Sequence, residues 1–133
     1  MPMLRRTGVL VLAATLVAAG GAPAAQAQSS QSSSVRNKSI AKPMVAKRGW
    51  STTQYRCLVK LWHRESGWNH RAANGSSGAY GIPQALPGHK MASSGRDWRT
   101  NPRTQIKWGL RYIKQRYGTP CRAWGHFQSH RWY

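Results

Sequence analysis

Glu65 is the residue of this chain best suited to acid–base chemistry. The chain has 21 Lys and Arg but only two acidic residues, Glu65 and Asp97. Glu65 lies in the segment Arg64-Glu65-Ser66-Gly67-Trp68-Asn69, beside glycine and tryptophan. A carboxylic acid in such a setting can donate a proton to a leaving group and later take one back. The structural alternative is a salt bridge to one of the many arginines.

The residues before Glu65 predict a helix that ends directly after it. Ser51 and Gln54 fit a capping box at its start, and Gly67 is typical of the residue that follows a helix end. Residues with helical spacing face the core: Tyr55, Leu58, Val59 and Trp62. Glu65 is therefore expected in the last turn, on or at the edge of the buried stripe. Burial there raises the pKa of a carboxyl group, whereas the positive charge of the chain lowers it.

A second helix is predicted from Asn101, an N-cap residue, and Pro102, a residue typical of the first helical position. Its apolar stripe is formed by Ile106, Leu110, Ile113 and Tyr117. Gly118 ends this helix, and Thr119-Pro120 can begin another. No window of the domain has the pattern of a β-strand, so we expect a mainly α-helical fold with long loops.

Residues 69–100 are predicted to form a long irregular segment between these helices. Gly75, Gly78 and Gly81 recur at intervals of three, which allows close approach of the backbone to a ligand or positive φ angles. The segment lacks the Gly-Lys-Ser/Thr pattern of a phosphate-binding loop. A loop of this length in a small domain is more often functional than a simple connection.

The chain divides into three predicted parts. Residues 1–27 have the features of a secretory signal peptide: Arg5-Arg6, an apolar run over 8–19, and a small-residue cleavage site at Ala25-Gln26-Ala27. The apolar run is shorter than the roughly 20 residues that a bilayer span needs. Residues 28–49 are rich in Ser and then in Lys and Arg, which predicts a flexible basic linker. Residues 50–133 hold all seven tryptophans and form the predicted catalytic domain.

Cys57 and Cys121 are the only cysteines of the chain. Following a signal peptide, such a pair predicts a disulfide. The bond would close a loop of about 65 residues, which the chain-entropy model values at roughly 4 kcal/mol. The five histidines have no metal-binding spacing and no Gly-x-Ser-x-Gly elbow is present, so neither a metal site nor a serine nucleophile is expected.

The charge of the chain predicts a polyanionic environment. The formal net charge is +19, and loss of Arg5 and Arg6 with the signal peptide leaves 19 basic and 2 acidic residues, a net charge of +17. Nucleic acid, anionic lipid and an anionic cell wall are the candidate partners, and the signal peptide favours the wall. We expect a secreted, wall-associated monomer that binds no nucleic acid and does not stay in the membrane after signal cleavage.

Three segments, taken in order, resemble the lytic transglycosylase domain of the soluble-lytic-transglycosylase type. Glu65-Ser66 is similar to the catalytic Glu-Ser segment of that family. The run Gly78-Ala79-Tyr80-Gly81-Ile82-Pro83-Gln84 resembles its Gly-Ala-x-Gly-Leu-Met-Gln segment. The pattern Ile106-x-x-Gly109-x-x-Tyr112-Ile113 resembles its Asn-Ile-x-x-Gly-x-x-Tyr-Leu segment, with Gln105 in the place of Asn. The departures are Ile82-Pro83 and Gln105.

The resemblance implies a small goose-type lysozyme/transglycosylase fold that acts on peptidoglycan glycan strands without a cofactor. It implies Glu65 as the catalytic acid. It also implies a set of substrate-binding residues: Ser66, Tyr80, Gly81, Gln84 and Tyr112. A tyrosine hydroxyl near Glu65 is expected to hold the carboxyl group, and Tyr112 is the candidate.

A mechanism with a single acid agrees with the composition. Retaining and inverting glycosidases normally use two carboxylates, whereas Asp97 lies between arginines before a helix and suits a loop or salt-bridge role. The expected reaction cleaves the bond between MurNAc and GlcNAc and leaves a 1,6-anhydro sugar. Two alternatives remain: a lysozyme-like hydrolase or muralytic protein of the resuscitation-promoting-factor kind, and a non-catalytic cationic wall-binding module with sugar-stacking tryptophans.

Overall fold

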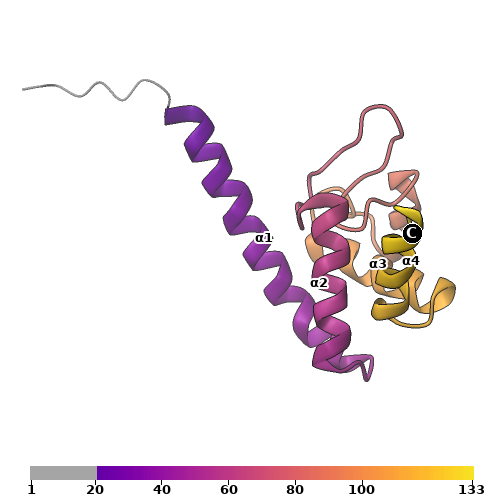
Figure 1. The fold of residues 1–133 in the computed structure, drawn as a ribbon. Coiled ribbons are helices and arrows are strands. Elements are labelled where there is room, and N and C mark those ends of the chain that lie inside the picture. Colours follow the sequence, from indigo (N-terminus) through magenta and orange to yellow (C-terminus); the bar gives the residue numbers. More distant parts are fainter. Residues whose placement is uncertain (1–20) are drawn as a thin grey trace, which may run out of the picture.

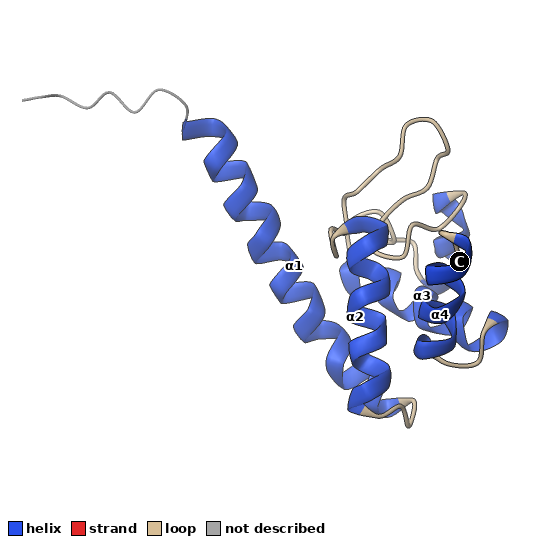
Figure 2. Cartoon of the chain, viewed as in Figure 1, coloured by secondary structure: helices blue, strands red, loops and turns tan. Residues whose placement is uncertain are grey.

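A computed structural model describes residues 21–133, and this part of the chain is mainly helical (Figure 1). The elements are α1 (Gly21–Lys47), α2 (Thr52–Ser66), the 3-10 helix η1 (Gly88–Ser94), α3 (Pro102–Arg116) and α4 (Pro120–His130). Apart from isolated bridges at Tyr80, the described residues contain no β-pairing, and a long loop connects α2 to α3 (Figure 2). The predicted fold class, a small lysozyme-like helical domain with one disulfide, is confirmed.

The helix ends follow the capping signals of the sequence. The Ser51 hydroxyl accepts a hydrogen bond from the Gln54 amide at the start of α2, and Gly67 ends this helix with a left-handed φ of 61°. The Asn101 side chain accepts from the Arg103 amide at 2.9 Å and so caps α3. Because the caps satisfy backbone donors that the helix cannot, they fix where each helix begins.

The structure differs from the flexible linker predicted for residues 28–49, because α1 covers this segment as far as Lys47. Asn37, Ala41 and Val45 lie one helical turn apart and are buried against the domain. The Asn37 amide also donates to the Trp68 carbonyl at 2.8 Å. The composition of this segment alone would not stabilise a helix, but these contacts with the domain do. The folded region therefore begins before Trp50.

The predicted signal peptide lies mostly outside the described residues, and its cleavage stays a prediction. Only residues 21–27 of that segment are described, as the first turns of α1. Within residues 21–133, none of the helices combines the length and the apolar character that crossing a bilayer requires.

The core lies where α2, α3 and α4 meet. α2 runs between α1 and the α3–α4 pair in the view of Figure 1. The buried residues of these helices and of the loop are Leu58, Leu61, Trp62, Trp68, Ile82, Ile106, Leu110, Ile113, Ala123 and Phe127. The predicted disulfide is confirmed: Cys57 and Cys121 are bonded, with Cα atoms 4.9 Å apart, and join α2 to α4.

Gln105 of α3 holds the long loop in place. Its side chain is fully buried, and its oxygen accepts a hydrogen bond from the Ile82 amide at 2.9 Å. Its nitrogen donates to the carbonyls of His70 at 2.9 Å and Trp98 at 2.7 Å. Gly81 has a φ of 78°, and a Cβ atom there would lie 2.5 Å from the Gln105 oxygen, so glycine alone fits this approach.

Candidate active site

Glu65 lies in the last turn of α2 and is partly buried. Burial raises the pKa of its carboxyl group from 4.5 to about 7, and no cation or hydrogen-bond donor among residues 21–133 offsets that shift. Of the two opposing effects expected from the sequence, desolvation therefore dominates. A carboxyl group with this pKa is protonated in a large fraction of molecules at neutral pH, as a general acid must be.

Ser66 connects the Glu65 turn to the loop. Its hydroxyl donates to the Ile82 carbonyl at 2.7 Å, and Ile82 is also the residue whose amide donates to Gln105. The same hydroxyl is 3.3 Å from the Trp62 carbonyl inside α2. Ser66 therefore fixes the distance between the end of α2 and the loop, and through it the position of Glu65.

Tyr133 is the residue that sequence reasoning missed. Its hydroxyl accepts a hydrogen bond from the Trp62 indole nitrogen at 2.8 Å and donates to the Pro83 carbonyl at 2.7 Å. The pKa of this hydroxyl is raised well above its usual value, first by burial and then by the negative charge of Glu65. The Tyr133 hydroxyl thus lies close enough to Glu65 to sense its charge, which is the place expected for a tyrosine of this site.

A pocket of about 230 Å³ opens beside Tyr133, between the loop, α3 and the C-terminal residues. It is lined by Pro83, Gln84, Ala85, Leu86, Lys90, Trp108, Tyr112, Arg116, Trp132 and Tyr133. Glu65 is not one of these lining residues, whereas Tyr133, whose pKa responds to the charge of Glu65, is one of them. The pocket is therefore adjacent to the candidate acid rather than centred on it.

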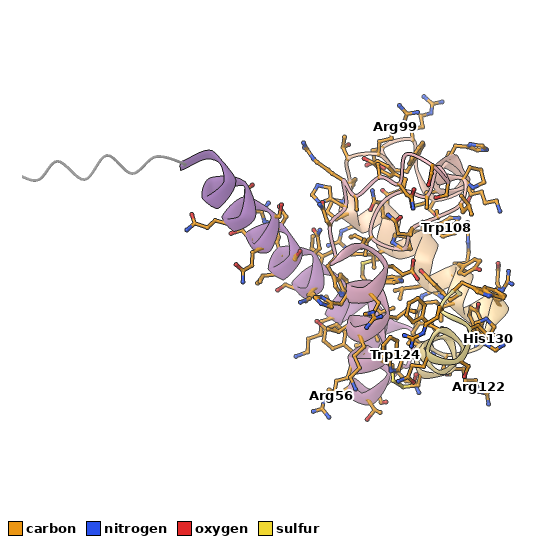
Figure 3. All side chains as sticks on the ribbon, turned by 45° about the horizontal axis from the view of Figure 1, so that its top comes forward. Arg56, Arg99, Trp108, Arg122, Trp124 and His130 are labelled. Carbon is orange, nitrogen blue, oxygen red and sulfur yellow. A yellow bond between two sulfur atoms is a disulfide. The ribbon has the colours of Figure 1, made fainter. Side chains whose placement is uncertain are left out.

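Aromatic side chains form one wall of this pocket. Trp108, labelled in Figure 3, and Tyr112 are stacked with their ring centroids 5.2 Å apart and their planes 13° from parallel. The Arg116 guanidinium lies 5.9 Å from the Tyr112 ring and 5.5 Å from the Trp132 ring. Flat apolar faces with a few polar groups at their edges are typical of pockets that bind organic ligands.

The remaining predicted site residues are divided between two places. Gln84 lines the pocket together with Tyr112, while its side-chain nitrogen donates to the Ala72 carbonyl at 3.1 Å and the Gly81 carbonyl at 3.0 Å. Gly81 faces Gln105. Tyr80 lies apart from the pocket: its hydroxyl donates to the Arg99 carbonyl at 2.7 Å, and its ring meets Trp98 edge-on. The structure brings Gln84 and Tyr112 together but not Tyr80.

Asp97 serves the start of α3. One oxygen of its carboxylate accepts from the Thr104 hydroxyl at 2.6 Å, and the other accepts from the Asn101 side chain at 2.8 Å. The hydrogen bond from Thr104, followed by that from Asn101, lowers the pKa of Asp97. An ionised carboxylate at a helix N-terminus is also favoured by the helix dipole. These contacts give Asp97 a structural task.

A comparison with protein-family models finds a match to the family described as the transglycosylase SLT domain, over residues 45–128. The chain belongs to this family. The matched range begins inside α1 and continues through most of α4, so it covers every part of the site described above except Trp132 and Tyr133. No curated protein and no solved structure matched.

The SLT domain has the general activity of a lytic transglycosylase on peptidoglycan, and the resemblance drawn from the three sequence segments is confirmed. Within the described part of the chain, no cluster of three or more His, Cys, Asp or Glu side chains could hold a metal ion. The candidate site of the SLT domain combines a carboxyl group with a pKa near neutrality, a tyrosine hydroxyl whose pKa responds to that carboxyl group, and an aromatic pocket next to the tyrosine.

Proposed function

We propose that the SLT domain cleaves the β-1,4 bond between MurNAc and GlcNAc with Glu65 as its single catalytic carboxyl group. The observation that carries this proposal is the partly buried position of Glu65 in the last turn of α2, where burial raises its pKa to about 7. A carboxyl group that holds its proton near neutral pH can protonate a glycosidic oxygen, which is the first requirement for breaking the bond.

The proposed reaction needs no water. Glu65 donates its proton to the bridging oxygen, the bond from this oxygen to C1 of MurNAc breaks, and the N-acetyl oxygen of the same sugar stabilises the positive charge at C1. The Glu65 carboxylate then takes the proton of the C6 hydroxyl, and the C6 oxygen bonds to C1. The products are a free GlcNAc hydroxyl, a 1,6-anhydro-MurNAc end and a reprotonated Glu65.

The position of Asp97 supports a mechanism with one carboxyl group. A hydrolase of the retaining or inverting kind requires a second carboxylate across the scissile bond. Asp97 is the only other acidic residue of the chain, and its two oxygens are engaged with Thr104 and Asn101 at the start of α3. It does not line the pocket beside Tyr133.

We further propose that the protein is secreted, remains at the cell wall and acts as a monomer. The sequence features of residues 1–27 support export, and a net charge of +17 after their removal supports retention by anionic wall polymers. Ser66, Gln84 and Tyr112 would contribute to the substrate site through the loop and the pocket. Amino-terminal sequencing of the exported protein should begin at Gln28 if the cleavage site is right.

The deciding experiment is digestion of purified peptidoglycan followed by mass analysis of the soluble fragments. Fragments lighter by one water than the hydrolysed muropeptides mark the anhydro end and support the proposal. Fragments with a reducing end would instead identify a hydrolase, and Asp97 would become a candidate base. No fragments from a folded, disulfide-bonded sample would favour a binding module.

Two variants make this experiment specific. Glu65→Gln keeps the size of the side chain but has no proton to donate, so it should fold, bind peptidoglycan and release almost no fragments. Asp97→Asn is the matched control, because it neutralises the other acidic residue, and it should keep substantial activity. Comparable loss of activity in both variants would contradict a single-acid mechanism.

A further inference from the structure

A groove between α1 and α3 gathers four cations over an apolar floor. It has a volume of about 440 Å³ and is lined by Met44, Lys47, Arg48, Arg103, Lys107 and Leu110. The four basic side chains are exposed, whereas Met44 is partly buried and Leu110 is fully buried at the base. We call this the α1–α3 groove.

Neither of the two acidic side chains lines this groove. The only two acidic residues are Glu65, at the end of α2, and Asp97, which Thr104 and Asn101 engage. A further cation, Arg111, adds to the positive charge near Arg48, and its charge lowers the pKa of Arg48 after the larger effect of burial. Cations held together without a counter-charge attract anions from solution.

The α1–α3 groove lies on the face of α3 opposite to the candidate sugar pocket. Successive helical residues are separated by about 100°, so Trp108, Tyr112 and Arg116 share one side of α3, and Arg103, Lys107 and Leu110 share the other. A ligand in the groove therefore leaves the pocket open. The same helix can bind two ligands at once.

We propose that the α1–α3 groove binds the phosphodiester chain of a teichoic-type wall polymer. Arginine and lysine both bind phosphate, arginine with two parallel hydrogen bonds. Arg103 and Lys107 are one turn apart, so their Cβ atoms are roughly 5–6 Å apart and can contact neighbouring parts of one polymer chain. The apolar floor suits the carbon chain of the alditol between phosphates.

Other polyanions fit the groove less well. A bilayer surface would be met by protruding apolar side chains, but the exposed large hydrophobic residues among those described are Val35, Leu86 and Trp132, none of which lines the groove. A single-stranded nucleic acid would be met by aromatic side chains for base stacking. The lining residues include none.

The proposal is tested with two double variants that remove the same charge. Arg103→Gln with Lys107→Gln alters the groove, and Arg56→Gln with Lys60→Gln alters the exposed face of α2, where Figure 3 shows Arg56 at the edge of the molecule. Neutralising Arg103 in the first turn of α3 does not oppose the helix dipole, so folding should be retained. Unchanged thermal unfolding of both variants verifies this.

The probe is purified poly(glycerol phosphate), and the measurement is its dissociation constant from each protein at several salt concentrations. We expect binding roughly tenfold weaker for the groove variant and less than about twofold weaker for the α2 variant. The salt dependence should also become less steep for the groove variant alone. Cleavage of peptidoglycan stripped of phosphate polymers should be the same for both variants and the parent.

Three outcomes would overturn the proposal. Equal weakening in the two variants would mean that the polymer binds the whole cationic surface. Selective loss of binding to phosphatidylglycerol vesicles, with polymer binding retained, would identify a lipid surface, and the same result with single-stranded DNA would identify nucleic acid. The binding measurement requires no cleavage of peptidoglycan, so its result tests the groove proposal independently of the proposed cleavage reaction.

Discussion

Glu65 is stabilised in its neutral form, and this has a consequence for the stability of the protein. Its pKa is about 7 in the folded state and 4.5 for the unperturbed side chain, so between these values the folded state binds more protons than the unfolded chain. The free energy of unfolding therefore falls as pH rises from 4.5 to about 7. Above this range the partly buried charge of Glu65 lowers the free energy of unfolding.

We predict that Glu65→Gln raises the melting temperature at pH 8 but hardly changes it at pH 4. Glutamine does not ionise, so the variant loses the penalty of a partly buried charge and keeps a similar shape. Thermal unfolding by circular dichroism at both pH values measures the effect. A difference in melting temperature that does not depend on pH would mean that Glu65 is not desolvated.

The activity of the parent protein should decrease as pH rises through about 7, because the protonated form of Glu65 is lost.

Tyr133 provides a second test at the level of single residues. Tyr133→Phe removes the acceptor of the Trp62 indole and the donor to the Pro83 carbonyl, at a cost of roughly 1–3 kcal/mol. Because the charge of Glu65 contributes to the pKa shift of the lost hydroxyl, we expect kcat to fall more than KM changes. Tyr112→Phe is the control: its ring would still stack on Trp108 in the pocket, so a change in KM should dominate. The reverse pattern would assign the positioning role to Tyr112.

Among the elements, α2, α3 and α4 were predictable because each carries a local start signal and an apolar stripe. Ser51, Asn101 and Thr119 are all observed as N-caps. α1 was not predictable, because its buried face is narrow and includes the polar Asn37. Its stability comes from contacts with residues about 30 positions away in the chain, which no local pattern contains.

Because α1 packs against the domain, substitutions of its buried residues should change the free energy of unfolding, whereas substitutions in a flexible linker should not. Asn37→Ala leaves the Trp68 carbonyl without its buried donor and should reduce the free energy of unfolding by about 1–3 kcal/mol. Ser39→Ala, at an exposed position of the same helix, should change it by less than about 0.5 kcal/mol. Chemical denaturation of both variants makes the comparison. If both substitutions have negligible effects on the free energy of unfolding, the interpretation of residues 28–49 as a flexible linker would be supported instead.

The disulfide stabilises the helix that carries the candidate acid. Cys57 lies about two turns before Glu65 on α2, and its bond to Cys121 joins that helix to α4. Replacing both cysteines by serine should reduce the free energy of unfolding by about 2–5 kcal/mol. Thermal unfolding with and without a reducing agent checks this, since reduction should lower the melting temperature of the parent and leave the double variant unchanged. Two free thiols in the untreated protein would contradict the bond.

For the molecule as a whole, positive charge is spread over the surface rather than confined to one side. Figure 3 shows Arg56 and Arg99 at opposite edges of the domain. We therefore predict that binding to isolated cell walls weakens strongly as salt is raised, because exposed charges are screened within about 10 Å at 0.1 M salt. A co-sedimentation assay with the inactive Glu65→Gln variant measures binding alone. Binding insensitive to salt would show that contacts other than charge retain the protein.

The candidate site was predictable only in part, for a reason that lies in the whole fold. Glu65, Gln84 and Tyr112 lie in motifs whose spacing can be read in the sequence. Tyr133 reaches the site through a contact between residues 71 positions apart, with Trp62. Local sequence patterns do not specify such a long-range contact, so the place of Tyr133 in the site could be found only from the structure.

The Gln105 junction explains how such a domain can diverge in sequence while its loop keeps its shape. All three hydrogen bonds of the Gln105 side chain go to main-chain groups, those of His70, Ile82 and Trp98. The loop is therefore anchored by atoms that every residue type other than proline shares, and substitutions along it leave the anchor intact. The family has Leu-Met where this chain has Ile82-Pro83. The anchor accommodates this change, because the only backbone amide that donates to Gln105 is that of Ile82, so a proline at position 83 removes no hydrogen bond from it. This anchor itself requires a particular residue type only at Gln105 and at Gly81.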